Sequence, residues 1–268
     1  MAEKSKQPKT GAYSRVIEAI FKLRYTEGAM KVAFDRDDIR KAAKKFGISN
    51  IGDIVYSFRY RAQWPDSIRK KAPEGMDWVI RAAGTAKYSF ELTPFANITP
   101  SPMLVETKIP NATPGLIETY ALSDEQALLA KLRYNRLIDV FTGLTCYSLQ
   151  NHLRTQVSGM GQVETDELYV GLDKRGSHYI IPVQAKGGSD KLGIVQIEQD
   201  VAMCAAKFPN LICRPVGAQF VSKAIIALFQ FELTPEGLAI SSEKHYRLVP
   251  PEEVSAEDLA AYRKRKDQ

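Results

Sequence analysis

The chain has 268 residues, of which 44% are hydrophobic and 25% charged, and its formal net charge is +6. This composition is that of a globular protein with room for one large domain or two ordinary ones. No apolar run is long enough to span a bilayer, and the polar residues 1–11 lack the apolar segment of a signal peptide. We therefore expect a cytoplasmic protein without a membrane partner. The cysteines have no metal-ligand spacing, which argues against a zinc site and fits a reducing compartment.

The positive charge is concentrated in the N-terminal part of the chain. Residues 1–75 carry 17 Lys and Arg against 9 Asp and Glu, whereas the remainder carries 20 against 22. A basic module beside a nearly neutral one is typical of a protein that binds a polyanion such as DNA. A solvated basic surface without a partner is the alternative.

The N-terminal region is predicted to form helices followed by a hairpin, after a disordered start at residues 1–11. The pattern predicts helices over residues 13–28, 37–46 and 50–61, a short apolar piece at 31–34, and hairpin strands at 78–81 and 88–92. Asp35 or Asp37 can cap the second helix, and Ser49 or Asn50 the third. Two short helices around a glycine-containing turn, followed by a hairpin, resemble a winged helix, so we expect a DNA-binding domain over residues 1–95.

The candidate DNA contacts are polar and basic residues of the second and third predicted helices. Those expected to reach base edges are Asn50, Ser57, Arg59 and Arg61. Those expected to contact phosphates are Lys41, Lys44 and Lys45. The alternative is a small structural helical subdomain whose basic residues only face water.

Five prolines between residues 93 and 122 indicate a connector, placed at 96–122, with one strand at 103–109. A second domain is expected over 123–250, and a charged tail over 251–268. Its predicted elements are a helix at 124–141 capped by Ser123, a helix at 146–157, strands at 164–172 and 178–186, a helix at 191–208, and strands at 211–221 and 224–233. This order argues for an α/β or α+β fold with a mixed sheet covered by helices.

The chemistry is expected where the two strands 164–172 and 178–186 meet. Gln184 and Lys186 are separated by one residue, so their side chains point to one face of the strand. Asp166 lies near the start of the neighbouring strand, where a hairpin begins to splay. An amide and a lysine at the end of an otherwise apolar strand would be awkward in a core, so we expect a cleft here. Mg²⁺ prefers one or two carboxylates with water and phosphate oxygens, and a nearby lysine can orient the attacking water.

The segments ETDELYVG and IIPVQAKGG resemble the signature of the PD-(D/E)xK nucleases, in the variant where glutamine replaces the middle acid. The resemblance covers residues 123–222 and implies a restriction-endonuclease-like fold. It implies Asp166 as the principal metal ligand, Gln184 as a carbonyl donor and Lys186 as the residue that handles the attacking water. Because Gln184 brings no charge, Glu164 could be a second ligand, with Glu167 as its rival if a bulge intervenes. Relatives often add an acid from the preceding helix, for which Glu125 and Asp139 are both candidates.

The tripeptide itself is not specific. The same three-residue pattern, in which an acid or glutamine is followed by any residue and then lysine, also occurs at Gln7–Lys9 and at Glu106–Lys108. The second is a real decoy because it ends an apolar strand, but prolines follow it where the family has a glycine-led helix. The hairpin, the acid, the glycine pair and the following helix together select Gln184–Lys186.

The sequence therefore predicts a Mg²⁺-dependent endonuclease of type II restriction character, in which Mn²⁺ can substitute. It is expected to act on double-stranded DNA as a homodimer, since two-strand cleavage needs two active sites, and to leave a 5′-phosphate by family analogy. Lys191, Gln196 and Gln199 could approach the duplex. The alternatives are a repair or junction-resolving nuclease on the same fold, and a non-catalytic DNA-binding regulator with a degenerate nuclease domain.

Overall fold

The computed structural model describes residues 9–60, 62–94, 96–121, 124–188, 190–235 and 237–265. Its contacts divide the chain into two compact units. The first consists of Met1–Ile98 with Gln156–Gln162 and Gly193–Gln196, and the second of Thr99–Thr155, Val163–Leu192 and Ile197–Gln268. In the described parts of the chain, no helix is long and apolar enough to cross a membrane.

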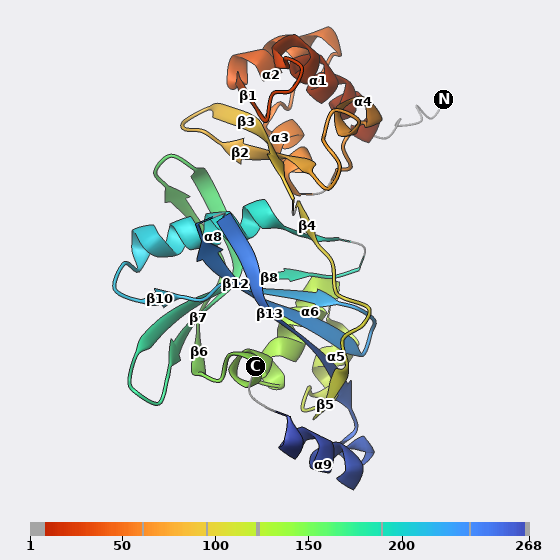
Figure 1. The fold of residues 1–268 in the computed structure, drawn as a ribbon, viewed down its shortest axis with the longest axis vertical. Helices are drawn as coiled ribbons and strands as arrows, with labels where there is room; N and C mark the ends of the chain where they lie inside the picture. Colours follow the sequence, from red (N-terminus) through yellow and green to blue (C-terminus); the bar gives the residue numbers. More distant parts are fainter. Residues whose placement is uncertain are drawn as a thin grey trace. The chain divides into compact units, whose positions relative to one another are not determined.

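The first unit packs helices on a small antiparallel sheet (Figure 1). Its main elements are α1 (Lys9–Arg24), β1 (Lys31–Asp35), α2 (Arg36–Lys45), α3 (Gly52–Tyr60), α4 (Asp66–Arg69), β2 (Asp77–Ala82) and β3 (Lys87–Thr93), with the short strand β4 (Asn97–Ile98). The sheet order is β1-β3-β2, so the first strand pairs with the distal strand of the hairpin. Apolar residues at helical spacing turn one face of each helix toward the sheet and form the core. Ile17, Ile54 and Trp78 are almost completely buried there.

The local signals of the first unit account for most of its boundaries. Asp35 caps α2 in a capping box with Asp38, which settles the choice left open between two aspartates. The first helix begins at Lys9, earlier than expected, so residues 9–11 are helical.

The second unit is built on a large mixed sheet with the order β5-β13-β12-β11-β8-β7-β6 (Figure 1). Its strands are β5 (Glu106–Pro110), β6 (Thr145–Val157), β7 (Gly161–Leu172), β8 (His178–Lys186), β9 (Leu192–Gly193), β10 (Ile212–Cys213), β11 (Val216–Phe220), β12 (Ile225–Thr234) and β13 (Gly237–Val249). Its helices are α5 (Gly115–Tyr120), α6 (Asp124–Tyr134), α7 (Leu137–Thr142), α8 (Ile194–Lys207), the 3-10 turn η1 (Pro251–Glu253) and α9 (Ala256–Lys264). β8 runs antiparallel to β7 but parallel to β11, to which it is connected through α8.

Helices flank both faces of this sheet, as the sequence predicted for the fold class. Leucines of α6 pack in one buried cluster with Val183 and Ala185 of β8. Gln184, between them on the strand, instead contacts Asp200 of α8. Because successive side chains of a strand point to opposite faces, α6 and α8 cover opposite faces of the sheet.

The predicted helix over residues 146–157 is wrong, because this segment is the strand β6. Cys146, Leu149, Leu153 and Val157 have the three- and four-residue spacing of a helix stripe, and this spacing is the reason for the wrong prediction. Pairing with β7 at the end of the sheet overrides that local pattern.

Several predicted boundaries also shift. The helix expected over 124–141 breaks into α6 and α7 at Asn135 and Arg136, where Arg136 adopts a left-handed conformation with φ of 50°. The strand expected over 211–221 is interrupted before Val216 by Pro215, which has no N–H to donate to a ladder. The helix after the glycine pair begins at Ile194 rather than at 191. The predicted connector 96–122 contributes β5 to the large sheet and contains α5.

Candidate functional site

Asp166 lies where the β7–β8 hairpin opens. The regular ladder ends at the pair Glu167–Val183, and beyond it the Asp166 carboxylate accepts a hydrogen bond of 2.8 Å from the backbone N–H of Ala185. The Asp166 side chain thus accepts the N–H that a backbone carbonyl would accept in a regular ladder. Only 7% of Asp166 is exposed, so its carboxylate is largely shielded from bulk water.

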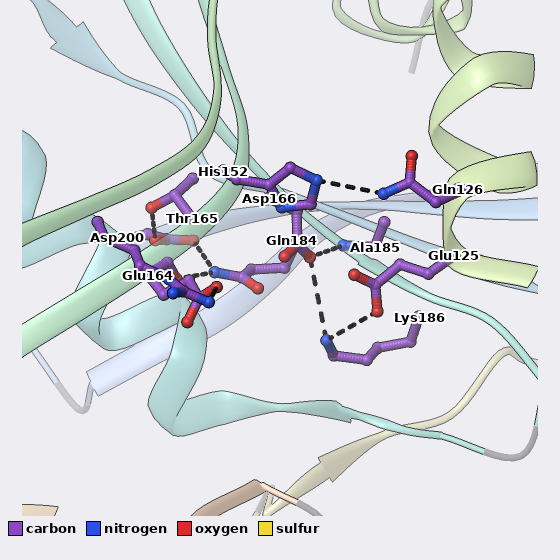
Figure 2. Close-up of polar contacts among 11 residues, drawn as sticks. Glu125, Gln126, His152, Glu164, Thr165, Asp166, Gln184, Ala185, Lys186 and Asp200 are labelled. Atoms are coloured by element: carbon purple, nitrogen blue, oxygen red, sulfur yellow. Dashed lines mark hydrogen bonds and ion pairs between the residues drawn. The ribbon is translucent and has the colours of Figure 1, made fainter. Parts of the chain in front are cut away.

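Lys186 brings Asp166 together with an acid from α6. Its Nζ lies 3.9 Å from Oδ2 of Asp166 and 3.7 Å from Oε2 of Glu125 (Figure 2). Of the two helix acids left open by the sequence, Glu125 is therefore the one that reaches the site. Asp139 instead pairs with Arg136 and accepts a hydrogen bond from the backbone N–H of Cys146.

Gly187 makes this approach of α6 possible. A Cβ at Gly187 would lie 2.5 Å from the Cβ of Asp124 and 2.7 Å from the backbone nitrogen of Glu125. Only a residue without a side chain lets the start of α6 come this close to the end of β8. The glycine after the lysine is thus needed for the close packing of α6 against the end of β8.

Gln184 is almost completely buried and is held by two acceptors on the nitrogen side of its amide. Its Nε2 donates to the backbone carbonyl of Glu164 at 2.9 Å and to Oδ2 of Asp200 at 3.0 Å. Asp200, on α8, is fully buried and also accepts a hydrogen bond of 2.5 Å from the hydroxyl of Thr165. Figure 2 shows this network beside the Asp166–Lys186–Glu125 group.

Sequence reasoning missed Asp200, although a signal for it existed. Asp200 lies on the apolar stripe of α8, three residues after Ile197 and four before Cys204, both of which are buried. An acid in such a stripe predicts a buried polar partner. The adjacent Gln199, which was predicted to approach the duplex, is buried, and Gln196, with the same prediction, is half-buried.

The other two acids proposed from the sequence have different partners. Glu164 forms an ion pair of 2.9 Å with Arg154 of β6, and its backbone rather than its side chain contacts Gln184. Glu167 is fully buried, pairs with Arg133 and accepts a hydrogen bond of 2.6 Å from the Tyr169 hydroxyl. Among the described residues, the carboxylates that contact Lys186 are those of Asp166 and Glu125.

His152 also lies near this group, on β6 rather than on the expected helix. Its backbone is in the left-handed region with φ of 47°, and its Nε2 lies 3.2 Å from Nε2 of Gln126 on α6. A positive charge on His152 would lower the pKa of Asp166.

Burial strongly affects the two aspartates. It raises the pKa of Asp166 to about 6, against the opposing effect of Lys186, and raises the pKa of Asp200 to about 8. Desolvation penalises the charged form of a buried carboxylate, and this is the larger cause in both cases. A nearby positive charge favours the ionised form of Asp166, as Lys186 does, so this position is suited to bind a cation.

These shifts predict how the stability of the metal-free protein depends on pH. Both folded-state pKa values lie above the ordinary value of 3.8, so between about pH 4 and 8 the folded state retains protons that the unfolded state has lost. Stability in EDTA should therefore fall as pH rises through this window, by on the order of 1–3 kcal/mol per group. Urea unfolding of the wild type and of Asp200→Asn tests this: the wild type should lose stability relative to the variant between pH 6 and 8. A constant difference would contradict the prediction.

The predicted DNA-contacting residues of the first unit are mostly at its surface. Lys41, Lys44, Lys45 and Asn50 are exposed, and Ser57 is half-buried. Arg59 is also half-buried, with its guanidinium 5.2 Å from the centre of the Tyr60 ring. Arg61 lies outside the described residues. Lys191, in the second unit, is exposed.

The decoy tripeptide has structural partners. Glu106 pairs with Arg247 at 2.5 Å, and Lys108 pairs with Asp258 of α9 at 2.9 Å. The backbone N–H of Lys108 also donates to the Tyr262 hydroxyl. Both side chains therefore join β5 to its neighbours at the end of the sheet.

Comparison with protein-family models finds no match, and no curated protein or solved structure is similar enough to count as a relative.

Proposed function

We propose that this protein is a Mg²⁺-dependent endonuclease that hydrolyses phosphodiester bonds of double-stranded DNA. The observation that carries the proposal is the meeting of Asp166, Lys186 and Glu125 at the open end of the β7–β8 hairpin, with Gln184 beside them. Two acids, an amide and an ammonium close together are the groups that metal-assisted phosphodiester hydrolysis requires.

The arrangement of the second unit supports this proposal. The elements α6, β6, β7, β8, α8 and β11 follow one another in the order of the PD-(D/E)xK core, interrupted by α7, β9 and β10. The strands lie in the order β6-β7-β8-β11, with the last pair parallel. A restriction-endonuclease-like fold is the finer interpretation of this mixed sheet.

The donor set fits magnesium better than zinc. Within the described residues there is no group of three or more His, Cys, Asp or Glu side chains that could hold a metal ion. Magnesium needs no such group, since it usually keeps several waters and takes one or two protein carboxylates together with substrate phosphates. Asp166 would hold Mg²⁺, or Mn²⁺ in its place, with Glu125 and the Gln184 oxygen as further donors.

Each residue of the site has a defined part in the proposed reaction. When bound, Mg²⁺ supplies a Lewis acid that stabilises the negative charge developing on the phosphate. Lys186, whose side chain is only 12% exposed, would donate to the attacking water and keep a positive charge beside the pentacoordinate state. Asp166 and Glu125 hold the ammonium between them before DNA binds. The low exposure excludes most bulk water and strengthens these electrostatic interactions.

We further propose that the first unit is a winged-helix module that binds the duplex. It has the order helix, strand, three helices and hairpin, the third of these helices being the single turn α4, and its first strand pairs with the second strand of the hairpin. In this interpretation α3 is the helix that enters the major groove, with exposed Asn50 just before it.

Replacing Lys41, Lys44 and Lys45 together by alanine tests the role of the basic surface. These side chains are exposed, so folding should be unaffected, whereas each lost phosphate contact should reduce the slope of log affinity against log salt by about 0.9. Binding to a duplex at several salt concentrations measures this. Affinity should fall to a similar extent for different sequences, since phosphates carry no sequence information. An unchanged salt slope would show that these lysines do not contact DNA.

The proposal further includes a homodimer of type II restriction character, since symmetric cutting of both strands needs two sites. Incubation of unmethylated phage DNA with the protein and Mg²⁺, followed by electrophoresis, tests the function. A discrete set of fragments with 5′-phosphate ends supports sequence-specific cleavage. Cleavage confined to branched DNA indicates a repair or junction-resolving nuclease. DNA binding without cleavage under any Mg²⁺ or Mn²⁺ condition indicates a non-catalytic regulator and overturns the proposal.

A further inference from the structure

The buried Asp200 carboxylate has no ion-pair partner in the described parts of the chain. Its hydrogen-bond partners are neutral groups: the Thr165 hydroxyl donates to one oxygen and the Gln184 amide to the other. A buried acid without a cation costs stability unless hydrogen bonds compensate for the lost water. A neutral apolar residue would fill this place in α8 at lower cost, so the carboxylate is expected to have a function.

Its contacts determine which way the Gln184 amide faces. An amide has a donor side, the NH₂ group, and an acceptor side, the oxygen. The NH₂ group of Gln184 faces two acceptors, the Asp200 carboxylate and the Glu164 carbonyl. Rotating the amide by 180° would place its oxygen against both of them. The oxygen is therefore held on the other side of the amide group, away from Asp200 (Figure 2).

We infer that Asp200 is a positioning residue, which fixes the Gln184 amide so that its oxygen is presented to the metal of the proposed nuclease site. Thr165 completes the arrangement by holding the second Asp200 oxygen. The inference rests on the proposed function and deepens it. The chain has Gln184 at the position where the PD-(D/E)xK signature has its middle acid, and the Asp200 carboxylate accepts a hydrogen bond from the amide of this glutamine. Residues that orient a metal ligand in this way typically contribute ten- to a hundredfold to metal affinity or activity.

A double-mutant cycle separates positioning from a merely structural role. Asp200→Leu keeps a branched side chain of similar shape but has no acceptor, so the NH₂ group of Gln184 loses one of the two acceptors that fix the amide. We expect the Mn²⁺ concentration for half-saturation, followed by electron paramagnetic resonance of Mn²⁺ alone, to rise about tenfold. In a Gln184→Ala background the same change should have almost no further effect, because Asp200 acts through Gln184. Glu198→Gln removes a negative charge from the same helix and serves as the matched control, with no expected change.

A metal-independent measurement distinguishes failure of this inference from failure of the proposed function. The side-chain NH₂ signals of Gln184, identified in ¹⁵N spectra by their loss in Gln184→Ala, should exchange slowly in the metal-free wild type and faster in Asp200→Leu, which removes the acceptor. If the protein does not cleave DNA but the slow exchange depends on Asp200, the proposed function is wrong and the positioning contact is supported. Unchanged exchange in Asp200→Leu, an equal Mn²⁺ effect in both backgrounds, or a change in thermal stability alone would overturn the inference.

Discussion

Replacing Lys186 by methionine is expected to slow Mg²⁺-dependent DNA cleavage about a hundred- to a thousandfold, the usual cost of removing one donor that stabilises a transition state. Methionine preserves the length of the side chain but cannot donate to the attacking water. Mg²⁺ binding should be retained or become tighter, because the ammonium no longer competes with the metal for Asp166 and Glu125. Single-turnover cleavage, together with DNA binding in a gel-shift assay, measures the two effects separately.

Two other lysines provide matched controls. Lys174 is exposed in the turn at the opposite end of the same hairpin, so Lys174→Met should leave cleavage unchanged. Lys108 belongs to the decoy tripeptide and pairs with Asp258, so Lys108→Met should lower stability without a specific effect on the cleavage step. Full activity of Lys186→Met, or loss of the chemical step in Lys108→Met with the fold intact, would contradict the assignment of the site.

Replacing Asp166 by asparagine is expected to have opposite effects on activity and on stability. Loss of the principal metal ligand removes several kcal/mol of transition-state stabilisation, so cleavage should fall about a thousandfold or more. In EDTA near neutral pH the variant should be as stable as the wild type or more stable, because the neutral amide avoids burying a charge. Its oxygen can still accept the N–H of Ala185. Thermal unfolding in EDTA and in Mg²⁺ measures both effects, and Mg²⁺ should stabilise only the wild type.

Glu164→Gln is the matched control for this change, two residues earlier on the same strand. Its carboxylate pairs with Arg154, and the contact to Gln184 comes from its backbone, so Mg²⁺-dependent cleavage should be retained. If Glu164→Gln abolished Mg²⁺ stabilisation while Asp166→Asn preserved it, the identity of the principal ligand would be wrong.

The parts of the site that depend on one hairpin were accessible from the sequence. Alternation along β8 predicted a shared face for Gln184 and Lys186, and the position of Asp166 at the opening of the hairpin followed from the turn at residues 173–176. In the structure the Lys186 ammonium reaches Glu125 of α6, whereas the Gln184 amide contacts Asp200 of α8. Both predicted relations are local, because strand side chains alternate between the two faces with a period of two residues and turn residues fix where a hairpin reverses.

The parts contributed by other elements were not accessible. Glu125 reaches Lys186 because α6 packs against Gly187, and Asp200 reaches Gln184 because α8 crosses the opposite face of the sheet. Both depend on packing between elements distant in the sequence, which no local pattern records. The strand β6 was missed for the same reason, since pairing with β7 decides its conformation.

The most direct test of the metal site is an anomalous difference map from crystals soaked in Mn²⁺. We expect one strong peak within about 2.0–2.3 Å of an Asp166 carboxylate oxygen, the distance range of hard divalent cations bound by oxygen ligands. The Gln184 oxygen should face the same peak. A Mn²⁺ ion bound elsewhere in the molecule, with the Asp166 carboxylate still held only by Ala185 and Lys186, would contradict the proposed site.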